Sequence, residues 1–92
     1  MIEIVKVVAL KVVGDCSLWL RFSDGQEGVR DCADILAEGG PMVEPLREKP
    51  FFDKVFISFG VPSWPNGYDV DAIALHMEME KAGLLSTSAA AE

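Results

Sequence analysis

Two turn signals near the N-terminus constrain the fold of this chain most. Gly14-Asp15 and Asp24-Gly25 are residue pairs typical of tight hairpin turns, and they interrupt a stretch rich in Val, Ile and Leu. The three segments that they separate are predicted to be strands: 2–13, 16–23 and 26–31. Strands joined by tight turns pair with their sequence neighbours, so this region is predicted to form an antiparallel meander. The first strand is apolar on both sides in its middle, at 7–10, so we expect both of its faces to be covered.

The register of the second hairpin depends on the length of its turn. A two-residue turn at Asp24-Gly25 pairs Leu20 with Val29. A three-residue turn that includes Ser23 pairs Leu20 with Gly28 instead. We favour the two-residue turn, because it brings two apolar side chains together across the strands.

The two cysteines, Cys16 and Cys32, are predicted to remain free. The two-residue turn places Cys16 opposite Ala33 and Cys32 opposite Ser17. Side chains alternate along a strand, so the two thiols are expected on opposite faces of the sheet, where they cannot form a disulfide. Free thiols also fit a reducing compartment.

Weaker signals divide the rest of the chain into short elements. Asp31 is predicted to cap a helix over 32–37, and Asp69 a longer helix over 70–82. A proline-containing loop, one helical turn and one or two short strands are expected between these helices: 41–50, 51–54, 55–59 and 60–64. We therefore predict an α+β fold, in which an antiparallel sheet of four to five strands carries a short helix and a longer C-terminal helix.

Length and charge limit the organisation and the partners. The 92 residues suffice for one domain, predicted at 1–85 and followed by a disordered tail at 86–92. With 15 acidic and 8 basic residues the net charge is −7, so the chain has no basic face for nucleic acid and would be repelled by an anionic membrane. The N-terminus lacks the pattern of a signal peptide, and no apolar run is long enough to cross a membrane, so we expect a cytoplasmic protein.

Several sequence blocks between Phe22 and Leu75 carry a family resemblance. They are Phe22-Ser23-Asp24-Gly25, Asp31 with Ile35-Leu36, Gly40-Pro41-Met42-Val43-Glu44-Pro45-Leu46-Arg47, Phe52 with Val55, and Trp64-Pro65-Asn66-Gly67-Tyr68-Asp69. In these blocks the chain resembles a bacterial family known as domain of unknown function 2442. The resemblance implies a small α+β fold with no established activity. Members often look like one half of a two-gene unit, in a layout similar to toxin–antitoxin pairs. Members usually have Pro soon after the last Asp, where this chain has Ala72.

The chain offers little for catalysis or metal binding. His76 is the single histidine and is far in sequence from Cys16 and Cys32, so no pair of nucleophile and base is indicated. These three residues also lack the spacing of zinc ligands. Pairs of carboxylates such as Asp31 and Asp34 are explained by helix capping and the helix dipole. We therefore predict no catalytic residue, no metal ligand and no cofactor.

The predicted C-terminal helix carries two apolar stripes on nearly opposite sides. One stripe, predicted to pack on the sheet, consists of Val70, Ile73, Ala74 and Met77. The other consists of Leu75, Met79 and Ala82. One helix of a small domain rarely needs two apolar faces for its own core. The second stripe is therefore predicted to be exposed and to form a protein interface, most simply in a homodimer.

Three further residues extend the set of interface candidates. Leu84 and Leu85 either continue the second stripe or fold back over the edge of the domain. Trp64 is either an interface anchor beside a rigid proline turn or a core residue that holds this turn on the sheet. The complete set is Leu75, Met79, Ala82, Leu84, Leu85 and Trp64.

Two functions fit the sequence. The favoured one is a non-enzymatic protein-binding module, similar to the antitoxin-like half of a two-gene unit, whose partner is a second copy of the chain or a small partner protein. The alternative is a small enzyme or ligand-binding domain with a pocket near Trp64 and Asp69. A large apolar interface on the last helix would favour the first function, and a pocket with an ordered ligand the second.

Overall fold

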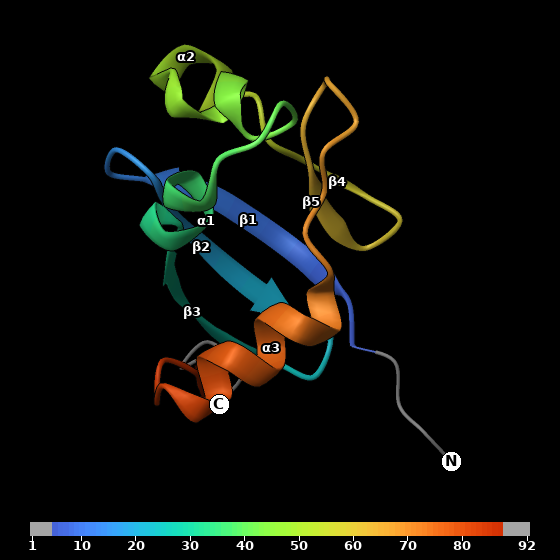
Figure 1. Ribbon diagram of the computed structural model, residues 1–92. Coiled ribbons are helices and arrows are strands. Elements are labelled where there is room, and N and C mark those ends of the chain that lie inside the picture. Colours follow the sequence, from blue (N-terminus) through green and yellow to red (C-terminus); the bar gives the residue numbers. More distant parts are fainter. Residues whose placement is uncertain (1–4, 88–92) are drawn as a thin grey trace.

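The turn signals near the N-terminus produce the meander that they predict. The computed structural model describes residues 5–87 and has an α+β architecture (Figure 1). Its main sheet is antiparallel and has the strand order β1-β2-β3-β6. The strands are β1 (Val7–Val13), β2 (Ser17–Phe22), β3 (Gln26–Asp31) and β6 (Ser86–Thr87). A separate two-stranded sheet consists of β4 (Phe56–Ser58) and β5 (Val61–Ser63). The predicted fold class is confirmed.

The helical segments lie between and after the strands. They are α1 (Ala33–Glu38), the 3-10 helix η1 (Glu44–Arg47), α2 (Lys49–Phe52) and α3 (Ala72–Lys81). Helix α3 begins later than predicted, because Asp69 bridges to Ser63 of β5 and the N–H of Val70 donates to the carbonyl of Pro62 at 3.1 Å. The cap is Asp71, whose carboxylate accepts the N–H of Ala74 at 2.9 Å, and not Asp69 as predicted.

The favoured register of the second hairpin is wrong. Leu20 pairs with Gly28, as the three-residue turn requires, and Val29 lies opposite Trp19 on the other face of the sheet. Both usual types of two-residue turn would need positive φ at the first residue, Asp24, but of these two residues only Gly25 has positive φ, at 89°. Gly28 also has to face inward, because a Cβ there would lie 2.2 Å from the carbonyl oxygen of Leu84.

This register places the two cysteines opposite one another, not on opposite faces as predicted. The N–H of Cys32 donates to the carbonyl of Cys16 at 2.8 Å. Both thiols are nevertheless free, as predicted, and each has its own acceptor: Asp31 Oδ1 for Cys16 and the Arg30 carbonyl for Cys32, both at 3.7 Å. Burial raises the pKa of Cys32 to about 12, and burial together with Asp31 raises the pKa of Cys16. Both thiols are therefore protonated and weakly nucleophilic.

The core lies on one face of the main sheet. Figure 1 shows α1 and α3 in front of β1 and β2, on the same side of the sheet. The residues buried there are Val7, Leu18, Leu20, Phe22, Cys32, Leu46, Phe52, Trp64, Ala72, Leu75 and Met79. The expectation that both faces of β1 are covered is wrong among the described residues, because Val8 and Lys11 are exposed.

The C-terminal segment departs from the predicted tail at its first two residues. Ser86 and Thr87 form β6, which pairs with Gln26 and Glu27 at the start of β3. The rest of the predicted tail, 88–92, lies outside the described residues.

Candidate functional site

The face of helix α3 that packs on the sheet is not the one predicted from the sequence but the opposite one. Leu75 and Met79 are buried in the core, although they were predicted to form an exposed interface. Ile73 and Met77, predicted to be core residues, are 44% and 51% exposed. Periodicity groups residues on a helix face but does not say which face turns inward. The pairing of the chain just before α3 with β5, through Val70, helps to fix this rotation.

Trp64 belongs to the core and holds the following turn in place. Its indole Nε1–H donates to the carbonyl of Phe52 at 3.0 Å, and its ring is tilted against those of Phe52 and Tyr68, at 5.6 and 5.8 Å between centroids. The Trp64 side chain is 2% exposed, so it is unavailable as an interface anchor. The structure thus answers the open question about this residue in favour of the core.

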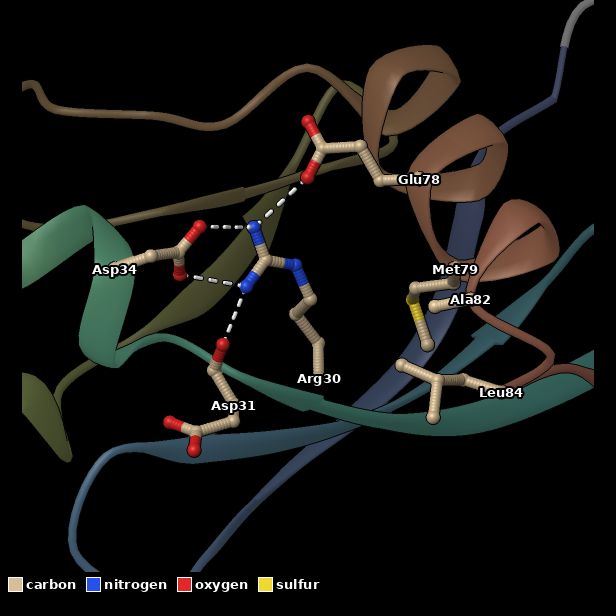
Figure 2. Close-up of a pocket in the computed structure, with 7 residues that line it drawn as sticks. All are labelled: Arg30, Asp31, Asp34, Glu78, Met79, Ala82 and Leu84. Carbon is tan, nitrogen blue, oxygen red and sulfur yellow. Dashed lines mark hydrogen bonds and ion pairs between the residues drawn. The ribbon is translucent and has the colours of Figure 1, made fainter.

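A hollow of about 250 Å³ lies between β3, α1 and the end of α3 (Figure 2). Its lining residues are Arg30, Asp31, Asp34, Glu78, Met79, Ala82 and Leu84. Three of the predicted interface residues thus contribute to it: Met79, Ala82 and Leu84. Figure 2 shows these three side chains on one side of the hollow and the ion-paired residues on the other. Neither Trp64 nor Asp69, the centre of the predicted ligand pocket, lines it.

Arg30 organises the polar side of this hollow. Its two terminal nitrogens donate to the two carboxylate oxygens of Asp34 at 2.8 and 3.0 Å, and Nη2 also donates to Glu78 at 2.8 Å. Nη1 donates in addition to the carbonyl of Asp31. The Arg30 side chain is 12% exposed, whereas those of Asp34 and Glu78 face solvent. These contacts join β3 to α1 and to α3.

The charges around Arg30 shift two pKa values. The hydrogen bonds that Arg30 donates to Asp34 lower the pKa of Asp34 below its ordinary value. These bonds, together with the one that Arg30 donates to Glu78, raise the pKa of Arg30 above its ordinary value. Because Arg30 is engaged by carboxylates, the exposed surface at this side of the hollow is an acidic edge formed by Asp34 and Glu78. An acidic edge beside an apolar wall suits a partner that presents basic and apolar side chains together.

His76 has a structural partner that its sequence position does not reveal. Its Nε2 lies 2.7 Å from Asp24 Oδ2, and its ring packs edge-on against Phe22 at 4.9 Å between centroids. The contact joins α3 to the turn between β2 and β3, across 52 residues of sequence. Among the described residues no thiol or hydroxyl group is hydrogen bonded to His76. The histidine therefore anchors α3 on the hairpin.

The described part of the chain holds no cluster of metal ligands and no helix suited to a membrane. Within residues 5–87, no three side chains among His, Cys, Asp and Glu come together so as to hold a metal ion. None of the helices in that range has the length and apolar character needed to cross a membrane. Two exposed surfaces of this part of the chain are the outer side of α3 and the edge of the hollow.

The comparisons with known proteins agree with the sequence blocks described above. The model of a family described as Protein of unknown function (DUF2442) matches residues 7–79, from the start of β1 to near the end of α3. No significant match is found among curated proteins or solved structures. Ala72, where the resemblance implied Pro, is the first residue of α3, a position that suits either residue. The chain therefore belongs to the DUF2442 family of proteins of unknown function.

Proposed function

We propose that this protein is a non-enzymatic protein-binding module that uses the outer face of α3. The observation that carries the proposal is the exposure of Ile73 and Met77, at 44% and 51%. These two residues lie one helical turn apart, opposite the face that already buries Leu75 and Met79. Apolar side chains so placed add nothing to the core of their own domain, but they suit contact with another protein.

The partner is expected to be a small protein with basic character. The net charge of −7 favours encounter with a basic surface. Glu78 belongs to the acidic edge and lies beside the outer face of α3. A module of this kind is similar to the antitoxin-like half of a bacterial two-gene unit. In that arrangement the partner is the product of the neighbouring gene.

Affinity capture with a matched pair of variants tests this proposal. The full chain is used as bait in cells of its native source, and bound proteins are quantified by mass spectrometry. Wild type and Glu80→Gln, a polar change at an exposed residue of the same helix, are expected to capture one protein in common. The double variant Ile73→Glu with Met77→Glu is expected to lose it at least tenfold while keeping its circular dichroism spectrum. Full retention of that protein by the folded double variant would contradict the proposal.

Direct binding to duplex DNA is not part of the proposed function. The excess of acidic over basic residues leaves too little positive charge to neutralise a run of phosphates. Fluorescence anisotropy with a labelled duplex at physiological salt is therefore expected to show no binding by the isolated chain. Micromolar binding in this assay would point to a basic surface that the charge argument misses.

A further inference from the structure

Cys16 and Cys32 face each other at one end of β2 and β3, on the core side of the sheet. The last paired residues of these strands are Ser17 and Asp31. The pairing continues by one residue, because the N–H of Cys32 donates to the carbonyl of Cys16 at 2.8 Å. Leu18 is buried in the core, and side chains alternate along a strand, so the Cys16 side chain also lies on the core side. Cys32 is itself a core residue. The register that removes the predicted separation of the two thiols thus brings them together.

The spacing of the two backbones suits a disulfide. Hydrogen-bonded residues of an antiparallel pair have Cα atoms about 5.5 Å apart, within the roughly 4.4–6.8 Å found in disulfides. Their Cβ atoms are about 4.5–5.5 Å apart and have to approach to roughly 3.5–4.5 Å. Both cysteines lie just outside the strands, Cys16 in the turn after β1 and Cys32 before α1, so this small approach breaks no strand pairing. A disulfide formed under such strain is readily reduced again.

The two thiols differ in exposure in the way that a two-step oxidation requires. Cys16 is partly exposed, whereas Cys32 is 3% exposed. An oxidant in solution therefore reaches Cys16 first, and Cys32 is the other cysteine of the chain. Burial and the neighbouring Asp31 raise the pKa of Cys16, so its reactive thiolate is scarce at neutral pH. Oxidation is expected to be slow there and to become faster as the pH rises.

We propose that Cys16 and Cys32 form a reversible intramolecular disulfide when the folded protein meets a peroxide. The Cys16 thiolate attacks one oxygen of hydrogen peroxide, which breaks the O–O bond, releases hydroxide and leaves a sulfenic acid. The sulfur of Cys32 then attacks the sulfur of this sulfenic acid, so that the S–S bond forms and the S–O bond breaks. In sum the two thiols lose two electrons and two protons, and the peroxide is reduced to two molecules of water. A thiol such as glutathione reverses the reaction by exchange.

The disulfide acts at the point where α1 begins. In the reduced protein Asp31 Oδ1 accepts the Cys16 thiol at 3.7 Å and the N–H of Ala33, the first residue of α1, at 2.9 Å. Oxidation removes the thiol donor and ties the turn after β1 to the residue before α1. The outer face of α3 contains neither cysteine, so this proposal does not depend on the proposed function.

Treatment of the full chain with hydrogen peroxide, followed by intact mass spectrometry and thiol counting, tests the proposal. Folded wild type is expected to lose the mass of two hydrogen atoms and both titratable thiols, and to regain them with reduced glutathione. Cys16→Ser and Cys32→Ala are the matched controls, because neither can form the bond. In Cys32→Ala the exposed thiol is expected to gain oxygen instead. Peptide mapping without reduction then identifies the two joined cysteines.

Equilibration with reduced and oxidised glutathione supplies a second measurement that needs no variant. The effective concentration of the two thiols is expected to be at least tenfold higher in the folded protein than in urea, because the fold holds them side by side. An effective concentration no higher than in urea would overturn the proposal. So would folded wild type in which peroxide yields only oxygenated Cys16, or only disulfides between two chains, with Cys32 left as a free thiol.

Discussion

Helix α3 and the β4–β5 hairpin both expose apolar side chains, but the two exposures differ in their physical cost. On α3, Ile73 and Met77 lie in regular helical backbone, so the only cost of their exposure is the unfavourable free energy of contact between apolar side chains and water. At the hairpin tip, Phe59 combines full exposure with a backbone conformation that a bulky residue avoids. Single exposed apolar residues on helices are common, whereas a strained aromatic residue at a turn requires a specific reason. The comparison shows that the free-energy cost of an exposed apolar residue depends on its backbone conformation as well as on its exposure.

Substitutions on the buried face of α3 are expected to lower the stability most. Leu75→Ala and Met79→Ala are each expected to lower the free energy of unfolding by about 2–5 kcal/mol, because each leaves a cavity in the core. Ile73→Ala and Met77→Ala are the matched controls and should cost less than about 1 kcal/mol. Urea unfolding followed by circular dichroism measures all four. Equal losses on the two faces would show that α3 is rotated differently from the structure described here.

The next effect concerns the contact between β3 and the chain after α3. A Cβ at Gly28 would lie 2.2 Å from the carbonyl oxygen of Leu84, and backbone has to move to make room for it. Gly28→Ala is therefore expected to lower the free energy of unfolding by about 1–3 kcal/mol. Val29→Ala, on the opposite face of the same strand, is the control and should cost less. A neutral Gly28→Ala in urea unfolding would instead support the register that pairs Leu20 with Val29.

A smaller effect is expected from the ion pairs of Arg30. Its hydrogen bonds lower the pKa of Asp34 in the folded state, so the stabilisation is present above the ordinary pKa of Asp and is lost as pH falls through the lower folded value. Because Asp34 and Glu78 are exposed, Arg30→Gln is expected to cost only about 1 kcal/mol at pH 7. The difference from wild type should narrow below about pH 4. Urea unfolding of both proteins at several pH values measures this difference in the free energy of unfolding. A difference that does not change with pH would show that the ionised Asp34 does not cause it.

The smallest predicted effect is a gain of stability at the tip of the β4–β5 hairpin. Phe59→Asn removes no buried contact and places a residue that tolerates positive φ at the turn. It is expected to raise the free energy of unfolding by up to about 1 kcal/mol, measured by urea unfolding. A clear loss of stability would mean that Phe59 makes contacts within its own domain.

Local sequence is enough to predict the strands of the meander, the places of the turns and the apolar periodicity of α3, because these depend on interactions between near neighbours. The prediction of free thiols was correct, although the predicted reason, two cysteines on opposite faces of the sheet, was wrong. Local sequence could not identify His76 as the partner of Asp24 or Glu78 as the partner of Arg30, since 52 and 48 residues separate these pairs.

The register of β3 and the rotation of α3 could not be predicted from the sequence. Each sequence pattern allows two structures. The turn before β3 can contain two residues or three, and either apolar stripe of α3 can face the core. The choice depends on what lies opposite, namely the Leu84 carbonyl against Gly28 and the β5 backbone against Val70. Periodicity states which side chains share a face, but the face that is buried is set by contacts between residues far apart along the chain.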